Sequence, residues 1–361
     1  MNRTVDIAIE PGGANLPLNV AAAGAAARPA DAAKALVIGH RGASGQRPEH
    51  TLASYELAAR MGAEYIEPDL VATRDGVLVA RHETEISGTT DVAERPQFAA
   101  RMRTNVIDGV ALTGWFTEDF TLPELSTLRA KESIPQLRQC NTIYDGRYRV
   151  PTFDGVICLV KRLSRELGRP IGICAETKHP SYFRSIGLAL EDPLVASLRE
   201  ARLDKRDSRV FIQSFEVGNL RALDAHIDVP LVQLLGAKDQ RPADDSRTYA
   251  QLATPAGLAT VARYADAIGP SKDYIVPRDA TGASIPPTSF VADAHAAGLL
   301  VHPYTFGNEN SFLPFELRRG SDLSAWGDAI AEYEQFFGLG VDGVFSDYPN
   351  TAIDGRDGPV D

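Results

Sequence analysis

The amino-acid sequence predicts an α/β fold in which parallel strands alternate with helices and close into a barrel. Short apolar runs follow one another from residue 35 to residue 347, and helical patterns separate most of them. Repeated units of this kind build either a closed barrel or an open doubly wound sheet. The chain has no G-x-G-x-x-G turn of the kind that marks dinucleotide-binding open sheets. The number of units therefore favours a closed parallel barrel.

Length and composition agree with such a domain. The chain has 361 residues, of which 44% are hydrophobic and 24% are charged, so it can bury a large core. No apolar run approaches the ~20 residues that span a bilayer, which excludes a transmembrane helix. The formal net charge of −11 argues against general binding to nucleic acid or anionic membranes, because the protein would repel phosphate polymers. Cys140, Cys158 and Cys174 form no C-x-x-C pair, so no disulfide framework is expected.

The N-terminal segment does not fit the barrel pattern. It is rich in alanine, and its run V-A-A-A-G-A-A-A at 20–27 is similar to the apolar centre of a signal peptide. Arg3 is the only base ahead of that run, and Asp6 does not fit the basic start of such a peptide. The expected organisation is a disordered extension or degenerate export signal at 1–34, a barrel domain at 35–354 and a tail at 355–361.

The first elements of the barrel are expected directly after this segment. They are a strand at Ala35–Gly39, a helix from Pro48 to Met61 that Gly62 ends, and strands at Glu64–Val71 and Val77–His82. The D-G pair at 75–76 predicts a two-residue hairpin turn between the last two strands. Such a turn pairs Val71 with Ala80. Two residues further out it pairs Asp69 with His82, so an acid and a histidine would meet across the ladder.

The remaining chain continues the alternation after an irregular stretch. Residues 84–155 show only a helical signature at Thr121–Ala130, and we interpret them as an insertion. The elements expected beyond it are helix Asp154–Leu167, strand 171–178, helix 185–203, strand Arg209–Phe215, helix 216–226, strand Val229–Leu235, helix 255–265, strand 266–270, helix Ser289–Ala297, strand Leu299–Phe306, helix Ala325–Phe337 and strand Val341–Asp347. Nine strand-like runs result, one more than a regular barrel holds. One member of the 64–82 hairpin or one late strand must therefore be irregular.

Polar side chains gather at the carboxyl ends of the expected strands. These residues are His40, Asp69, Glu176, Lys178, Gln213, His302 and Tyr304. In parallel barrels the carboxyl ends of all strands meet on one rim, and that rim carries the active site. We therefore expect these side chains to surround one site.

Three carboxylates on this rim form a candidate metal site. Glu67 and Asp69 are two residues apart on one strand, so their side chains emerge on the same face, and Glu176 lies near the end of another strand. Oxygen ligands suit a hard cation such as Ca²⁺ or Mg²⁺. The alternative is that each acid pairs with a nearby base, as Glu176 would with Lys178. Their concentration on one rim together with two histidines favours a site for one divalent cation.

Two histidines, His40 and His82, each follow an apolar strand. A lone histidine at such a place is more often a hydrogen-bonded core residue than a catalyst. Two histidines that converge on an acidic cluster indicate proton transfer, because imidazole is readily poised for it near neutral pH. Neither histidine lies in an H-E-x-x-H zinc motif.

The same rim is expected to hold cations and pocket residues. An acidic protein needs bases such as Arg41 and Lys178 if its substrate carries a phosphate, and the alternative is that they only balance the acids. Gln213, His302 and Tyr304 are expected to line the pocket for the unreactive part of a substrate, with plain core packing as the alternative.

A set of spaced motifs runs through the chain. They are H-R-G at 40–42, P-E-x-T at 48–51, E-x-D at 67–69, D-G-x-x-V-x-x-H at 75–82, E-x-K at 176–178, Q-S-F at 213–215 and G-V-F-S-D-Y-P at 343–349. From about Val37 to Pro349 this set resembles the glycerophosphodiester phosphodiesterase family, and the sequence around His40 resembles its exported, periplasmic type. Two departures occur, since Glu83 and Ser346 replace the usual aspartate and threonine.

The resemblance implies a fold and a set of roles. The fold is a TIM (β/α)8 barrel of the PI-phosphodiesterase-like type, with a small insertion after its early strands. The implied roles are acid and base for His40 and His82, ligation of one divalent cation, Ca²⁺ or Mg²⁺, by Glu67, Asp69 and Glu176, and phosphate contacts for Arg41 and Lys178.

The resemblance also implies a function, which is metal-dependent hydrolysis of a small glycerophosphodiester to sn-glycerol 3-phosphate and an alcohol. Two alternatives are a phospholipase-like phosphodiesterase on lyso- or intact lipids and a protein that binds glycerophosphodiesters without hydrolysing them. The residues leave open which histidine is the base, whether water or the glycerol 2-hydroxyl attacks, and which head group is preferred. They leave the oligomeric state open as well. The exported type implies a periplasmic or secreted protein, although the N-terminal residues form no clear signal peptide.

Overall fold

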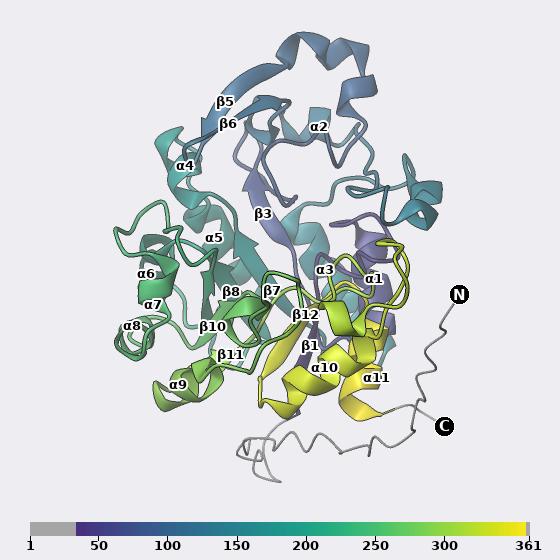
Figure 1. The fold of residues 1–361 in the computed structure, drawn as a ribbon. Coiled ribbons are helices and arrows are strands. Elements are labelled where there is room, and N and C mark those ends of the chain that lie inside the picture. The colour runs from purple at the N-terminus through teal and green to yellow at the C-terminus, as the bar shows by residue number, and fades with distance from the viewer. Residues whose placement is uncertain (1–33, 359–361) are drawn as a thin grey trace, which may run out of the picture.

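Parallel strands form a nearly closed eight-stranded barrel, as the sequence predicts (Figure 1). The computed structural model describes residues 34–358. In sheet order the barrel strands are β11 (Leu300–Val301), β10 (Ala267–Pro270), β9 (Leu231–Leu235), β8 (Val210–Ser214), β7 (Gly172–Thr177), β2 (Tyr65–Ile66), β1 (Leu36–Gly39) and β12 (Gly343–Ser346). The backbone N–H of Phe306 donates to the carbonyl of Phe345 at 2.9 Å, so the segment after β11 reaches β12 and joins the two ends of the sheet.

Helices cover the outside of the barrel (Figure 1). They are α1 (Leu52–Arg60), α3 (Phe153–Glu166), α4 (Pro180–Ser185), α5 (Glu191–Ala201), α6 (Val217–Asp224), α7 (Tyr249–Leu252), α8 (Pro255–Val261), α9 (Phe290–Ala296), α10 (Ala329–Gly338) and α11 (Pro349–Asp357). The hydroxyl of Thr51 accepts a hydrogen bond from the N–H of Ser54 at 3.1 Å and thereby starts α1. Within residues 34–358, no helix has the length and apolar character that crossing a bilayer requires.

Two apolar cores lie on the two sides of the barrel wall. The larger one fills the space between strands and helices and includes Tyr55, Leu163 and Tyr333 from α1, α3 and α10. The smaller one fills the inside of the barrel and consists of Ile38, Tyr65, Cys174, Phe211, Val232, Leu234, Ala267 and Phe345. Because the inside is packed, a site can form only at an end of the barrel.

The stretch interpreted as an insertion forms a lobe above the barrel, at the top of Figure 1. It contains the antiparallel hairpin β5 (Arg103–Ile107) and β6 (Val110–Gly114), followed by the short helix α2 (Leu122–Leu125). Asp108 and Gly109 connect the two strands with φ angles of 49° and 82°, the left-handed geometry of a two-residue hairpin turn. The helix predicted at Thr121–Ala130 is shorter than expected, because α2 has only one turn.

The strand predicted at Glu64–Val71 is interrupted. Pro68 separates β2 from β3 (Asp69–Ala72), and β3 pairs with β7 in parallel and with β4 (Leu78–Ala80) in antiparallel orientation. Pro68 has no N–H for a ladder, which explains the break. Strand β4 lies off the barrel path, so it accounts for the ninth strand-like run.

The hairpin register predicted between β3 and β4 is wrong by one residue. Val71 pairs with Val79 rather than with Ala80, because the turn has three residues instead of two. The N–H of Thr73 donates to the carbonyl of Val77 at 3.0 Å, which closes that longer turn. As a result the backbone carbonyl of Asp69 accepts a hydrogen bond from the N–H of Arg81 at 2.9 Å. His82 follows Arg81 and lies beyond this pair.

Other predicted bounds also differ from the structure. Regular pairing of the strand predicted at Leu299–Phe306 ends at Val301. The helix predicted at 185–203 is shorter and corresponds to α5, while α4 precedes it. Helix α11 continues to Asp357, beyond the expected domain end at 354. The extension predicted at 1–34 lies outside the described residues except for residue 34, and residues 359–361 of the predicted tail lie outside them as well.

Candidate active site

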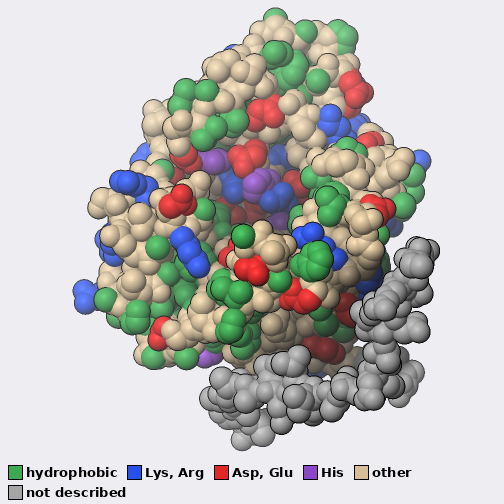
Figure 2. Space-filling model, viewed as in Figure 1, with side chains coloured by type: hydrophobic (Ala, Val, Ile, Leu, Met, Phe, Trp, Pro, Cys, Tyr) green, Lys and Arg blue, Asp and Glu red, His purple; other side chains and the backbone are tan. Residues whose placement is uncertain are grey.

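The polar residues predicted for the rim gather in a hollow at the carboxyl end of the barrel. Figure 2 shows histidine, basic and acidic side chains together on the floor of this hollow. A cavity of about 110 Å³, which we name the central cavity, lies there. Its lining residues are His40, Arg41, Glu67, Asp69, His82, Glu176, Lys178, Phe215, Leu234, Tyr304, Thr305 and Phe345. Eight of the ten predicted site residues are therefore brought together, and Gln213 and His302 are not among the lining residues.

The three predicted metal ligands are neighbours. Asp69 and Glu176 are paired across the ladder between β3 and β7, and one carboxylate oxygen each from Glu67, Asp69 and Glu176 lie within 4.8 Å of one another. All three side chains are buried. Gln213 stands behind this cluster, where its amide donates to Glu67 Oε1 at 2.6 Å. Gln213 thus contacts a carboxylate and holds it in place.

The charges of this cluster are strongly unbalanced. Burial and the nearby carboxylates of Asp69 and Glu176 raise the pKa of Glu67. Burial also raises the pKa of Glu176 to about 7, although Lys178 Nζ at 3.0 Å opposes the rise. For Asp69 burial acts in the same direction, but His50 at 3.0 Å and Lys178 outweigh it and lower the pKa. A cation among these oxygens would remove the repulsion.

The donor set fits a hard divalent cation. The ligand atoms are all carboxylate oxygens, which Ca²⁺ and Mg²⁺ prefer. Among the described residues, Asp69 Oδ1 is buried and has no hydrogen-bond partner, so one oxygen of the cluster is left for such an ion. Glu67, Asp69 and Glu176 form the only group of this kind within residues 34–358.

His40 follows β1 and is oriented by a carboxylate from the last strand. Its Nδ1 lies 2.6 Å from Asp347 Oδ1, and its Nε2 lies 3.8 Å from Glu67 Oε2. An ionised carboxylate only accepts hydrogen bonds, so Nδ1 carries a proton and donates it to Asp347. Asp347 is ionised, because Arg138 and His40 lower its pKa against the effect of burial. Asp347 was not predicted for the site, although it stands at the carboxyl end of β12, where a rim residue is expected.

Arg138 reaches this aspartate from the insertion. Its guanidinium is buried and donates to Asp347 Oδ2 at 2.5 Å and to Glu309 Oε1 at 2.7 Å. No regular pattern surrounds Arg138 in the sequence, so only the folded chain shows this contact.

His82 follows β4 and is oriented in the same manner as His40. Its Nδ1 lies 3.0 Å from Glu83 Oε1, and its Nε2 lies 3.3 Å from Lys178 Nζ. Burial, Arg41 and Lys178 lower the pKa of His82 to about 4. The imidazole is therefore neutral at pH 7 in the free protein, with its proton on Nδ1.

The predicted phosphate contacts have acidic partners as well. Arg41 Nη1 donates to Glu49 Oε2 at 3.0 Å, and Arg41 Nε lies 3.7 Å from Asp69. Lys178 pairs with Glu176 at 3.0 Å. Both bases nevertheless line the central cavity, where an anion can approach them. Arg41 and Lys178 can therefore balance the acids and also bind an anion.

His302 lies away from the central cavity, which corrects the expectation that it lines the pocket. The side chain is fully buried, and its ring packs edge-to-face on Phe211 inside the barrel with centroids 5.3 Å apart. Burial lowers its pKa to about 4. His302 and Tyr304 lie on the same face of this segment, but His302 comes two residues earlier and therefore lies deeper in the barrel, against Phe211. Tyr304, two residues later, does reach the cavity, and its hydroxyl donates to the carbonyl of Leu235 at 2.6 Å.

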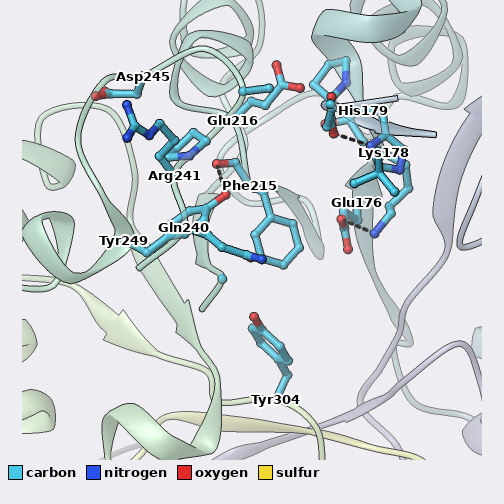
Figure 3. A pocket seen from close by; sticks show the side chains of 18 residues that line it. Glu176, Lys178, His179, Phe215, Glu216, Gln240, Arg241, Asp245, Tyr249 and Tyr304 are labelled. Atoms are coloured by element: carbon cyan, nitrogen blue, oxygen red, sulfur yellow. Dashed lines mark hydrogen bonds and ion pairs between the residues drawn. The ribbon is translucent and has the colours of Figure 1, made fainter. Parts of the chain in front are cut away.

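Two further cavities flank the central one. The large side cavity has a volume of about 860 Å³ and shares Glu176, Lys178, Phe215 and Tyr304 with the central cavity. Figure 3 shows Glu176, Lys178 and His179 on one side of it and Gln240, Arg241 and Tyr249 on the other. The small side cavity has a volume of about 260 Å³ and shares His40, Arg41 and Thr305 with the central cavity. The central cavity thus shares part of its wall with each side cavity.

Comparison with known proteins assigns the chain to a family. Residues 40–351 match the model of the glycerophosphoryl diester phosphodiesterase family. The glycerophosphodiester phosphodiesterase GDPD6 of Arabidopsis thaliana is 35% identical over 334 residues, which cover 89% of this chain and 86% of that protein. A glycerophosphodiester phosphodiesterase of Haemophilus influenzae is 29% identical over 342 residues, which cover 88% of this chain and 89% of that protein.

Solved structures share the fold. A phosphodiesterase of Oleispira antarctica, in complex with the product sn-glycerol-3-phosphate, superposes with a TM-score of 0.59 at 21% identity and covers 90% of this chain and 97% of its own. A glycerophosphodiester phosphodiesterase of Agrobacterium tumefaciens superposes with a TM-score of 0.54 at 19% identity and covers 88% of this chain and 98% of its own. The fold and the match over residues 40–351 lead to one conclusion: the chain belongs to the glycerophosphoryl diester phosphodiesterase family.

Proposed function

We propose that this chain hydrolyses glycerophosphodiesters to sn-glycerol 3-phosphate and an alcohol, with one divalent cation held by Glu67, Asp69 and Glu176. The observation that supports the proposal most is the lining of the central cavity. Two carboxylate-oriented histidines, three clustered acids and two bases face one space. The family match and the product bound to the Oleispira antarctica phosphodiesterase agree with this reaction.

The three cavities suit the shape of a phosphodiester, in which two ester arms extend from one phosphorus atom. We place the phosphate in the central cavity, next to Arg41 and Lys178. The small side cavity is lined by hydrogen-bonding groups of Ser44, Glu49 and Ser133, which suit the hydroxyls of a glycerol arm. Ile134 and Phe312 line the same cavity, so these polar groups stand beside apolar surface that can contact the glycerol carbons. The alcohol arm then extends into the large side cavity.

This placement assigns a role to each histidine. His40 lines both the central and the small side cavity, while His82 lies beside Lys178 at the other end. Attack on phosphorus occurs in line with the leaving group, so the attacking oxygen comes from the side of His40. The lone pair on His40 Nε2 accepts the proton of that oxygen, and His82 donates a proton to the leaving alkoxide.

Charge on the phosphate is neutralised by groups that are already in place. Arg41 and Lys178 donate hydrogen bonds to the non-bridging oxygens, where negative charge grows in the transition state. A bound cation would act as a Lewis acid on the same oxygens. The substrate anion also offsets the two bases that lower the pKa of His82, which favours the protonated form that the leaving group requires. Gln213 fixes Glu67, and Tyr304 closes one wall.

The experiment that tests the proposal is a product assay. Purified protein is stripped with chelator, supplied with Ca²⁺ or Mg²⁺, and incubated with glycerophosphocholine, while glycerol-3-phosphate dehydrogenase reports the product. Formation of sn-glycerol 3-phosphate supports the proposal. Binding of the substrate without product would instead support a binding protein, and product from lysophosphatidylcholine alone would support a lipid phosphodiesterase.

A further inference from the structure

A chain of hydrogen bonds connects His82 with the tip of the β5–β6 hairpin. One carboxylate oxygen of Glu83, Oε1, lies 3.0 Å from His82 Nδ1. The other, Oε2, lies 2.9 Å from His179 Nε2. His179 Nδ1 in turn lies 2.6 Å from Asp108 Oδ2. Asp108 is a turn residue of the hairpin, and His179 directly precedes α4. Four side chains from three separate segments therefore form one continuous path.

The protons of this path are fixed by its acceptors. Both ring nitrogens of His179 face carboxylates, which only accept hydrogen bonds, so each nitrogen carries a proton and the ring is an imidazolium. Glu83 is held as a carboxylate, since the hydrogen bonds from His179 and His82 lower its pKa although burial opposes them. The proton of neutral His82 must then lie on Nδ1. Its Nε2, which faces Lys178 and the central cavity, keeps the lone pair.

His179 has no other place in the proposed reaction. It lines the large side cavity and not the central one, and its backbone adopts the left-handed conformation with φ 48° and ψ 46°. Non-glycine residues rarely adopt this conformation, and here it directs the ring toward Glu83 and Asp108. Glu83 needs such a second contact, because a glutamate side chain has one more rotatable bond than the aspartate usual at this position.

The hairpin itself is fixed to the barrel by an independent contact. The amide of Asn105, on β5, donates to the hydroxyl of Tyr182 on α4 at 2.5 Å. Helix α4 begins directly after His179. This contact fixes the position of the hairpin turn relative to His179. Asp108 can therefore restrain the imidazolium ring of His179 instead of moving with it.

We propose that His179 and Asp108 are positioning residues, which act through Glu83 to keep the Nδ1–H of His82 on Glu83 and its Nε2 toward the central cavity, where Nε2 takes up the proton that it donates to the leaving alkoxide. The inference rests on the proposed role of His82. This role would bring a second part of the insertion, the β5–β6 hairpin, to the active site. The first part is Arg138, which contacts Asp347 behind His40. The removal of partners behind a functional histidine typically costs about 10- to 100-fold in function.

A mutant cycle tests this inference through kinetics. We expect His179→Ala and Asp108→Ala to lower kcat about tenfold with little change in KM, and His179→Gln, which keeps a donor toward Glu83, to recover part of the loss. Val106→Ala, an exposed position on the same hairpin, serves as the control and keeps full activity. In a Glu83→Ala background His179→Ala should cost nothing more, because the path is already broken. An equal loss in both backgrounds would mean a merely structural role and overturn the inference.

A spectroscopic measurement keeps the inference separate from the proposed function. Imidazole ¹⁵N shifts of His82, assigned by their loss in His82→Asn, should report the Nδ1–H tautomer in the wild type at pH 7. In His179→Ala they should report a mixture of tautomers. This result is expected whether or not the protein hydrolyses glycerophosphodiesters. A His82 that keeps its Nδ1–H tautomer in His179→Ala would contradict the positioning role.

Discussion

Asp69 and Glu176 lie directly opposite each other in the parallel ladder between β3 and β7, although the whole insertion separates them in the chain. Neighbouring parallel strands bring their carboxyl ends to one rim, so this pairing is a property of the barrel. Because both side chains are buried within 4.8 Å of Glu67, the site has more negative charge than its bases balance. This excess predicts how the protein responds to a cation.

Glu176→Gln should change cation binding and stability in opposite directions. Burial disfavours the charge of Glu176 more than Lys178 stabilises it, so the variant without cation should unfold at the same temperature as the wild type or higher. Loss of one ligand should weaken cation affinity about 10- to 100-fold, and the stabilisation by added Ca²⁺ or Mg²⁺ should disappear. Thermal unfolding with and without cation measures both effects. Glu132→Gln, another buried glutamate outside the cluster, is the control and should keep the shift.

Arg138→Met should destabilise the protein strongly. The arginine pairs with the buried carboxylates of Glu309 and Asp347, and both would be left without their cation. Such a loss costs about 3–5 kcal/mol. Urea unfolding measures the change, with the exposed Arg147→Met as a control that should stay within about 0.5 kcal/mol. A cost below about 1 kcal/mol for Arg138→Met would show that the insertion does not hold Asp347.

His302→Leu should have little effect on activity. The ring is fully buried on Phe211, and neither ring nitrogen has a hydrogen-bond partner among the described residues. Replacing an unpaired polar group by an apolar one of similar size is close to neutral for stability. We expect kcat within about twofold of the wild type and stability within about 1 kcal/mol. A tenfold loss of kcat at full stability would show that His302 contributes to the substrate pocket.

Stability should fall on the alkaline side because of His179. Burial opposes protonation, but hydrogen bonds to Asp108 and Glu83 outweigh it and raise the pKa of His179 to about 9, with Lys178 as the opposing neighbour. A folded-state pKa above the ordinary 6.5 means that this stabilisation is complete below pH 6.5 and is lost as the pH rises through about 9. The effect is at most about 3 kcal/mol. Urea unfolding at pH 6 and pH 9.5 should show the loss in the wild type and a smaller one in His179→Gln.

The barrel and its rim could be predicted from sequence because they follow from local patterns. Apolar runs locate the strands, and the fixed direction of parallel strands then places Asp69, Glu176 and Lys178 on one rim. The extra strand-like run was also expected, and β4 explains it. The family resemblance is confirmed by the match over residues 40–351.

Features that depend on exact chain geometry could not be predicted. One additional turn residue shifted the register and moved His82 away from Asp69, a difference that the D-G pair does not reveal. The contact of Arg138 with Asp347 forms only in the folded insertion, whose chain has little regular pattern. His302 shows the limit of alternation, since alternation predicts which face of the strand a side chain occupies but not how deep in the barrel it lies.

The most direct measurement of the central claim compares the wild type with His40→Ala and His82→Ala in the sn-glycerol 3-phosphate assay. A positioned acid or base contributes about 10²–10⁴-fold, so each variant should lose turnover by that factor while its thermal unfolding in the presence of cation stays close to that of the wild type. His302→Leu, the buried histidine outside the cavity, should retain turnover in the same assay. Turnover near the wild-type level in either alanine variant would contradict the proposal that these two histidines carry the protons of the reaction.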